Sequence, residues 1–379
     1  MTGRRLRIAM IGQRGVPATF GGVERHVEEL GSRLAERGHR IAVYVRTNYV
    51  REQRTEYRGM RVRNLPTVNS KHLDAIVHSA LSTIDAMAGG VDIVHYHAIG
   101  PGLPSFLPTY LSRAKVVQTV HGRDAERAKW GPAARTVLRT AEWMSAHVPD
   151  ATIVVARNLA DHYERTYGRR TWVIPNGVEP GAGRPAVAIA DRWDLAEGSF
   201  ALFVGRLVPE KAPDLLIRAW RHVPGDRKLV IAGGSSFTDD YVRSLERLAA
   251  QDDRVVLAGY VFGAPLEELY ANAAAFVLPS ALEGLPLTLL EAAAYGTPIV
   301  ASDIPPHLEV LDEDGPGHRF FSAGSEGSLV DALERSFLDP AAEGEGARKL
   351  RDRVLETYRW DRVVDETERL YRHVLDGSA

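Results

Sequence analysis

Short, continuous apolar segments alternate with amphipathic segments along the whole chain, and this alternation limits the folds that the chain can adopt. The apolar segments are 8–12, 41–45, 91–97, 116–120, 152–156 and 172–176 in the first half, and 200–205, 229–234, 255–261, 274–280 and 298–303 in the second. Because their apolar residues are continuous, they are typical of strands buried on both faces of a parallel sheet. Between the first two, Val23, Val27, Leu30 and Leu34 have helical spacing, and Gly38 can end the helix.

The same alternation occurs in both halves, and a chain of 379 residues is long enough for two domains with separate cores. The boundary is predicted after Asn176-Gly177, because the stretch 179–190 is rich in Pro, Gly and Ala and is typical of a linker. Residues 1–177 and 178–360 are therefore predicted to be two doubly wound α/β domains of the Rossmann-like type. The segment 358–375 is predicted to be a terminal helix.

Charge is distributed unevenly between the two halves. Residues 1–175 carry 26 Lys and Arg against 15 Asp and Glu, and residues 176–379 carry 21 against 34, which together give the net charge of −2. A basic domain can meet an anionic partner such as a membrane surface, a phosphorylated lipid or nucleic acid, or its arginines can simply be solvated.

Some classes of protein are disfavoured by what the sequence lacks. The chain has no cysteine, which excludes disulfides and cysteine-ligated zinc. No segment approaches the roughly 20 apolar residues of a membrane span. The apolar run at 8–11 is too short for the core of a signal peptide. We therefore expect a cytoplasmic protein.

The segment EGLPLTLLE places Glu283 and Glu291 around the expected start of a helix. Glu283 is expected in the loop at the carboxyl end of a strand, and Glu291 about one turn into the helix 287–295. The first N–H groups of this helix, around Leu287 and Thr288, have no partner within the helix and can bind a phosphate. A nearby carboxylate can accept hydrogen bonds from sugar hydroxyls, although a glutamate at a helix start can also merely complement the helix dipole.

The segment GRLVPEK, residues 205–211, directly follows a predicted strand. Arg206 and Lys211 suit a diphosphate, because arginine offers a planar fork of donors and lysine a mobile point charge. Glu210 is expected to orient the loop. An ordinary charged surface turn is the alternative.

The segment GQRGVPATFGGVE, residues 12–24, lies between the first predicted strand and the first predicted helix. It lacks the G-x-G-x-x-G spacing of a dinucleotide-binding loop, since Gln13 and Arg14 follow Gly12, and this disfavours NAD binding. Gly21-Gly22 before a helix permits close approach of the backbone to a phosphate or sugar, with plain turn formation as the alternative.

Histidines end two of the predicted strands. The side chain of His121, in TVHGRD, must face either a ligand or a partner in the core. His95 and His97 alternate on one face of the preceding strand, as two metal ligands would, but no acidic third ligand is evident nearby. Asn176, in IPNG, is expected to form a tight Asn-Gly turn at the domain boundary.

The segment 127–147 combines basic residues with tryptophan. These residues are Arg127, Lys129, Trp130, Arg135, Arg139 and Trp143. Such a composition can mark contact with an anionic membrane interface, and a packed surface helix is the alternative.

Taken together, these motifs resemble the large retaining, two-domain glycosyltransferase family (group 1, family four type) that contains bacterial mannosyl-, rhamnosyl- and glucosyltransferases of cell-surface glycans. The resemblance covers nearly the whole chain, because GGVE, HG, IPNGV, GRLVPEK, EGLPLTLLEAAAYGTPIVASD and the closing YRW segment follow the family's order. GQRGVPATFGGVE and HGRDAERAKWG further resemble a subgroup linked to rhamnosyl transfer in capsule or exopolysaccharide assembly.

The resemblance implies two facing Rossmann-like doubly wound domains, the GT-B fold, with a donor cleft between them. The last helix, 361–379, would pack back on the first domain. Residues 178–360 would bind the nucleotide sugar, and residues 1–177 would bind most of the acceptor.

The resemblance also implies roles for individual residues. Arg206 and Lys211 would hold the donor diphosphate, Glu291 the ribose hydroxyls, and Glu283 would face the donor sugar. The other donor-binding residues would be Gly205, Tyr260, Val261, Gly284, Leu285, Pro286, Leu287 and Thr288, with Tyr260 and Val261 beside the base. In the first domain, His121 would contact the sugar, and Gly21-Gly22 would approach the phosphates or the acceptor. The catalytic set would be His121, Glu283, Arg206 and Lys211.

The implied reaction is retaining transfer of a hexosyl or deoxyhexosyl group from a nucleotide-diphosphate sugar to a glycan, lipid-linked or small-molecule acceptor. The sequence offers cations for the leaving phosphate and no carboxylate pair like that of a glycosidase, so positioning and charge stabilisation would drive the reaction. The nearest approach to a metal-binding Asp-x-Asp motif is Asp312-Glu313-Asp314, in a loop rich in Gly and Pro. We therefore expect no metal. We also expect no cofactor and no nucleic-acid partner, and the basic domain can make peripheral contact with an anionic membrane.

Other functions stay open at this point. A nucleotide-sugar 2-epimerase shares the architecture and needs no acceptor. A pyridoxal-phosphate phosphorylase also shares it, but the chain is short for one. A two-lobed sugar-binding protein is the non-enzymatic alternative, and it would normally carry a secretion signal.

Overall fold

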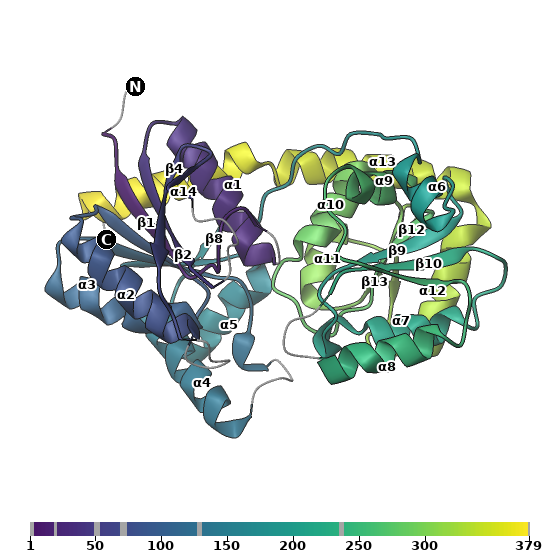
Figure 1. Cartoon of the computed structure of the whole chain (residues 1–379), viewed down its shortest axis with the longest axis horizontal. Coiled ribbons are helices and arrows are strands. Elements are labelled where there is room, and N and C mark those ends of the chain that lie inside the picture. Colours follow the sequence, from purple (N-terminus) through teal and green to yellow (C-terminus); the bar gives the residue numbers. More distant parts are fainter. Residues whose placement is uncertain are drawn as a thin grey trace. The chain divides into compact units, whose positions relative to one another are not determined.

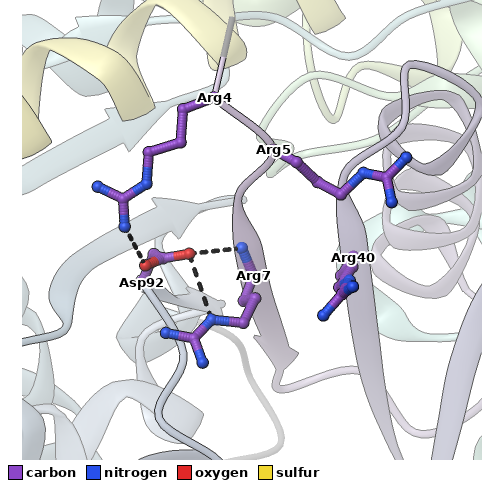
Figure 2. A pocket seen from close by; sticks show the side chains of 5 residues that line it. All are labelled: Arg4, Arg5, Arg7, Arg40 and Asp92. Atoms are coloured by element: carbon purple, nitrogen blue, oxygen red, sulfur yellow. Dashed lines mark hydrogen bonds and ion pairs between the residues drawn. The ribbon is translucent and has the colours of Figure 1, made fainter.

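The computed structural model describes residues 4–18, 21–48, 54–68, 74–126, 131–234 and 239–377. The chain forms two compact units (Figure 1). Unit 1 consists of Met1–Gly177 and Trp360–Ala379, and unit 2 of Val178–Arg359. Each unit contains one sheet covered by helices, and each is described by itself below.

The sheet of unit 1 has the strand order β3-β4-β2-β1-β5-β6-β7-β8. All neighbouring strands are parallel except β3 and β4. The strands are β1 (Arg7–Ile11), β2 (Arg40–Arg46), β3 (Glu56–Tyr57), β4 (Met60–Leu65), β5 (Ile93–His97), β6 (Lys115–Val120), β7 (Ala151–Val154) and β8 (Trp172–Val173). From β1 the chain first builds β2 and β4 on one side and then crosses to β5 on the other, so the strand order reverses between β1 and β5.

The sheet of unit 2 is wholly parallel, with the order β11-β10-β9-β12-β13-β14. Its strands are β9 (Phe200–Val204), β10 (Lys228–Ala232), β11 (Val255–Gly259), β12 (Ala275–Leu278), β13 (Ile299–Ser302) and β14 (His318–Phe321). Here the order reverses between β9 and β12. In open α/β sheets such a point, at the carboxyl ends of the strands, is where ligands bind.

Helices connect the strands in both units. Those of unit 1 are α1 (Gly22–Glu36), α2 (Asp74–Ala88), η1 (Gly100–Ser105), α3 (Phe106–Leu111), η2 (Asp124–Glu126), α4 (Pro132–His147), α5 (Arg157–Tyr167) and α14 (Trp360–Asp376). Those of unit 2 are α6 (Ala188–Trp193), η3 (Pro209–Lys211), α7 (Pro213–Trp220), α8 (Asp239–Ala249), α9 (Ala264–Asn272), α10 (Leu287–Tyr295), α11 (Pro305–Leu311), α12 (Glu326–Leu338) and α13 (Pro340–Thr357). None of the helices in the described ranges is long and apolar enough to cross a membrane.

The C-terminal helix α14 belongs to the core of unit 1, where it packs beside α1 (Figure 1). Leu34 of α1 and Leu370 of α14 are buried in one apolar cluster with Ile8 and Met10 of β1. Ile11 of β1 lies instead in a second cluster, on the other face of the sheet. Strand β1 is therefore covered on both faces, which explains why its residues 8–11 are continuously apolar.

Every apolar run that we predict as a strand is one, but the sequence pattern misses β3, β4 and β14. In β4, the buried Met60 and Val62 alternate with exposed Arg61 and half-buried Arg63. In β14, only Phe321 of the four residues is fully buried. These strands lie at or near sheet edges, where one face can stay polar, so they lack the continuous apolar signal.

The prediction of a linker at 179–190 is wrong, because this stretch is part of unit 2. The backbone N–H of Gly181 donates to the carbonyl of Ala294. The N–H groups of Val187 and Ile189 both donate to the buried Glu268 carboxylate, at 3.0 and 3.1 Å. Helix α6 begins within the stretch, at Ala188.

The prediction of a tight Asn-Gly turn at Asn176 is also wrong. No turn is formed there, and Gly177 has no left-handed backbone conformation. A Cβ atom at Gly177 would instead lie 2.4 Å from the ring of Trp360. Gly177 therefore allows close packing of α14, and the buried Asn176 side chain is bonded to His26.

Candidate functional site

The residues expected to bind the donor lie at the carboxyl ends of four strands of unit 2. Gly205–Lys211 follows β9, Gly233-Gly234 follows β10, Tyr260–Phe262 follows β11, and the loop 279–286 follows β12. Strands β9 and β12 flank the point where the strand order reverses. The parallel sheet therefore brings together segments that are about 80 residues apart in the sequence.

Gly205, after β9, and Gly233, after β10, allow the two loops to pack against each other. A Cβ atom at Gly233 would lie 1.8 Å from the carbonyl oxygen of Gly205, and its backbone has φ +147°. The N–H of Leu207 donates to the carbonyl of Gly234 at 2.9 Å. The loop carrying Arg206 is thus fixed at the strand end, with the Arg206 side chain 37% exposed.

Lys211 and Glu283 form an ion pair across the strand-order reversal, with 2.5 Å between Nζ and Oε1. Their side chains are only 13% and 9% exposed. The backbone also joins the two loops, because the N–H of Ala281 donates to the carbonyl of Glu210. Of the three N–H groups of an ammonium, Glu283 accepts from one.

Glu283 is buried but ionised. Burial raises its pKa, yet the charge and hydrogen bond of Lys211 outweigh burial and hold the pKa of Glu283 below its ordinary value. Ser280 Oγ also donates to Oε1, at 2.7 Å. The buried His307 lies close enough for its charge to favour the carboxylate, but burial lowers the pKa of His307 to about 4. Ser280 and His307 are site residues that the sequence motifs miss.

The start of α10 has the features expected of an anion site. The backbone N–H groups of Leu287 and Thr288 form no hydrogen bond within the described ranges. The Thr288 hydroxyl is buried and likewise has no partner there. Glu291 lies one turn further on, where its Oε2 accepts a hydrogen bond of 3.0 Å from Tyr270. Tyr270 is therefore a further residue that orients the site, and nothing in its own sequence context indicates this.

The loop after β11 presents two aromatic rings. Tyr260 and Phe262 are stacked, with centroids 6.0 Å apart and an angle of 8° between the rings. They are 42% and 51% exposed, whereas Val261 is buried. Tyr260 also lies over Gly234, where a Cβ atom would come within 2.3 Å of the ring. In the loop after β12, Leu285 is buried.

In unit 1 the candidate residues also gather where the strand order reverses. Gly12, after β1, touches the end of β5 so closely that a Cβ atom would lie 2.2 Å from the carbonyl oxygen of His97. Gly21 precedes α1 with φ +138°, and Gly22 is the first residue of that helix. The carboxylate of Glu24 lies over Gly21 and accepts a hydrogen bond from the N–H of Arg14, at 3.1 Å.

His121 follows β6 and contacts other histidines of unit 1. Its Nε2 is 3.4 Å from Nδ1 of His97, and its ring meets that of His26 edge-on, with centroids 4.8 Å apart. His95 differs, because both of its nitrogens are bonded, to Tyr371 at 2.6 Å and to Thr119 at 2.7 Å. His26 is the member of this group that the sequence motifs miss.

Part of the basic segment 127–147 lies outside the described residues, namely Arg127, Lys129 and Trp130. The rest forms α4, where Trp143 is 50% exposed. Most of the residues at 131–140, including Arg135 and Arg139, are exposed and the others are half-buried. This half of α4 is therefore largely exposed to solvent.

Two family models match the chain, one in each unit. A model described as glycosyltransferase family 4 matches residues 20–181, and one described as glycosyl transferases group 1 matches residues 199–339. Together they cover well over half of the chain.

Similar proteins agree with these matches. A D-inositol 3-phosphate glycosyltransferase of Xylanimonas cellulosilytica is 29% identical over 75% of this chain and 76% of its own. A sucrose-phosphate synthase of Thermosynechococcus elongatus has a TM-score of 0.84, with 21% identity, over 98% of this chain and 100% of its own. The Anabaena protein Alr3699/HepE, solved with UDP-glucose, has a TM-score of 0.80, with 18% identity, over 97% and 99%. The chain thus belongs to the group 1 glycosyltransferases of the family 4 type and has their two-domain GT-B fold.

Proposed function

We propose that this glycosyltransferase moves a hexosyl or deoxyhexosyl group from a nucleotide-diphosphate sugar to a glycan, lipid-linked or small-molecule acceptor, with retention of anomeric configuration. The observation that carries the proposal is the ion pair of Lys211 and Glu283, buried where the strand order of unit 2 reverses. A leaving diphosphate needs a positive group there, and the carboxylate keeps the ammonium in place.

Unit 2 offers a partner for each part of the donor. Arg206, Lys211 and the open N–H groups at the start of α10 would bind the two phosphates. Glu291, oriented by Tyr270, would accept hydrogen bonds from the ribose hydroxyls. Glu283 would face the transferred sugar.

The base and the sugar would have further partners. The exposed rings of Tyr260 and Phe262, with Val261 between them, suit a flat base at the rim of the site. Gly205, Gly284, Leu285 and Pro286 would supply close backbone approach around the sugar and phosphates. In unit 1, His121 would contact the sugar, and Gly21-Gly22 would approach the phosphates or the acceptor.

Catalysis would rest on stabilising the departing diphosphate, without a metal or cofactor. Arg206 and Lys211 would neutralise the charge that develops on the leaving oxygen. Retention would follow if the acceptor attacks from the face that the diphosphate leaves. The resemblance of residues 12–24 to capsule and exopolysaccharide enzymes makes a deoxyhexose such as rhamnose one donor sugar to test.

Nucleoside diphosphate release from a panel of UDP-, GDP- and dTDP-sugars tests the proposal. The panel should begin with UDP-glucose, which the similar Anabaena protein binds, and include dTDP-rhamnose. We expect one nucleotide to raise the melting temperature and its sugar to be hydrolysed slowly or transferred. NMR of the product then reports the anomeric configuration.

The same panel separates the alternatives. Conversion of the donor to its 2-epimer without an acceptor would favour an epimerase, and binding of free sugars without turnover would favour a sugar-binding protein. If no nucleotide sugar is bound or consumed by the wild-type protein, the proposed function is wrong.

We also propose that unit 1 contacts an anionic membrane at the cytoplasmic side, where a lipid-linked acceptor would be held. Large apolar side chains are exposed on three helices that all contact η1. They are Leu81 and Ile84 of α2, Phe106, Tyr110 and Leu111 of α3, and Val137 and Trp143 of α4, and we call them the α2–α4 face. Tyr110 and Leu111 are the most exposed of them, at 71% and 70%.

The charges near the α2–α4 face favour an anionic partner. The exposed arginines Arg113, Arg135 and Arg139 form no ion pair with another described residue. The acidic residues of α2 and α4 do have partners, since Asp74 and Asp85 form ion pairs with Arg46 and Arg63, and Glu142 is bonded to His162. An apolar surface with unpaired arginines suits anionic lipid headgroups above acyl chains.

Sedimentation with vesicles of phosphatidylglycerol or of phosphatidylcholine tests this contact. We expect binding to the anionic vesicles only, and a several-fold weaker affinity after Trp143→Ala or the double change Arg135→Glu and Arg139→Glu. Trp172→Ala is a matched control, because Trp172 is 41% exposed and also contacts a histidine ring. Equal loss in the control, or no binding to either vesicle, would contradict the proposal.

A further inference from the structure

Three histidines of unit 1 converge from different elements. His26 lies on α1, His97 ends β5, and His121 follows β6. One ring nitrogen of each lies within 4.8 Å of those of the other two. The closest pair, Nδ1 of His97 and Nε2 of His121, is 3.4 Å apart. Two nitrogens bound to one tetrahedral zinc ion are about 3.3 Å apart, given Zn–N bonds of about 2.0–2.1 Å. The closest pair has this spacing already, and the third ring would have to turn toward that pair, because the three nitrogens are spread over as much as 4.8 Å.

A hydrogen bond prepares the ring of His26 to bind a metal. Asn176 Oδ1 accepts from Nδ1 of His26 at 2.9 Å, so Nε2 of that ring keeps its lone pair. A hydrogen bond of this kind behind a metal-binding histidine orients the ring. Nε2 of His97 is buried and has no partner in the described ranges, so no second hydrogen bond fixes this ring.

We propose that His26, His97 and His121 form a site for one divalent transition-metal ion, with Zn²⁺ as the principal ligand, and that the bound ion inhibits sugar transfer. Three imidazoles without a carboxylate favour Zn²⁺, Ni²⁺ or Cu²⁺ and disfavour Mg²⁺ and Ca²⁺. His95 is not a ligand, because Tyr371 and Thr119 occupy both of its nitrogens. His121 is half-buried, which gives the ion access and leaves a fourth position for water.

Inhibition is expected because His121 would serve both the metal site and the donor sugar. The inference of inhibition rests on the proposed function. A metal ion takes the lone pair that His121 would otherwise offer to the donor sugar. The ion also places two positive charges beside the position proposed for the donor sugar. Transfer itself would need no metal, so chelation would raise the activity rather than abolish it.

Metal binding can be measured without any activity assay, using tag-free protein. We expect equilibrium dialysis against about 20 µM Zn²⁺ to give one ion per chain, and Co²⁺ to give the visible absorption of a tetrahedral site. Zinc binding and the Co²⁺ absorption should both weaken at least tenfold in His26→Asn and in His121→Ala. Two variants are used so that a folding defect in one of them does not decide the result. His147→Gln is the control, since His147 is exposed on α4. No zinc bound by the wild type, or an unchanged stoichiometry in both variants, would overturn the site.

The inhibition is tested separately, on the donor identified above. We expect Zn²⁺ but not Mg²⁺ to inhibit the wild type, and EDTA to reverse the inhibition. In His26→Asn, with activity expressed relative to that of the same variant without metal, the half-inhibiting Zn²⁺ concentration should be at least tenfold higher than in the wild type. Zinc bound at full stoichiometry without inhibition would leave the site in place but overturn its link to His121. Failure of the donor panel would instead contradict the proposed function and leave the binding result unaffected.

Discussion

Replacing Lys211 with methionine is expected to lower kcat/KM by about 10²–10⁴-fold, or roughly 3–5 kcal/mol of transition-state stabilisation. The ammonium would no longer meet the charge on the departing diphosphate. The change also leaves the Glu283 carboxylate, only 9% exposed, without its cation. A buried charge that loses its partner is strongly destabilising, so the melting temperature should fall as well.

Combining Lys211→Met with Glu283→Gln separates catalysis from stability. The amide removes the uncompensated charge, so the double variant should regain most of the melting temperature while its kcat/KM stays at least about 10²-fold below wild type. Lys228→Met is the matched control, because Lys228 begins β10 at the opposite end of the same sheet and is also bonded through Nζ. If the double variant recovered activity as well as stability, the ion pair would have a purely structural role and the prediction would be wrong.

Lowering the pH from 7.5 to 5.0 is expected to destabilise unit 1 more than unit 2. Burial lowers the pKa of His26 and His78 to about 4 and that of His95 to about 3, and all three belong to unit 1. His307 of unit 2 has a pKa lowered to about 4. The unfolded chain takes up these protons near pH 6.5, whereas the folded protein does not.

The sign follows from proton uptake. Between about pH 6.5 and pH 4 the unfolded state binds more protons than the native state, so the free energy of unfolding falls as the pH falls. Below about pH 4, and for His95 below about pH 3, these groups are protonated in both states and cause no further loss. Each histidine should cost about 2 kcal/mol between pH 7.5 and 5.0, which amounts to about 6 kcal/mol for the three in unit 1.

Peptide-resolved hydrogen exchange at the two pH values, corrected for intrinsic rates, measures each unit separately. Protection of β1 and β5 should fall more than that of β9 and β12. In His95→Gln the loss of unfolding free energy in unit 1 should be about 2 kcal/mol smaller. Glutamine can still bond Tyr371 and Thr119, but it does not titrate. His373→Gln, at an exposed position of α14, should leave the loss unchanged. An equal loss in both units would contradict the prediction.

Local patterns in the sequence are sufficient to predict most of the fold. Continuous apolar runs identify the strands that are buried on both faces, since burial on both faces removes polar residues. The run at 172–176 is an exception, because both residues of β8 are exposed. Such runs miss β4 and β14, whose exposed or half-buried positions keep arginine. The motifs likewise locate Lys211 and Glu283 at the ends of two strands, because both follow apolar runs directly.

Contacts between distant segments are decided only by the tertiary structure. The sequence contains Lys211 and Glu283, but their pairing depends on β9 and β12 being neighbours across the reversal of strand order. Ser280, Tyr270 and His26 occupy ordinary positions in strand-end, helix and helix-start segments, so nothing local marks them. Their roles arise because a parallel sheet places the carboxyl ends of remote strands side by side, and burial there sets the charge that each group carries.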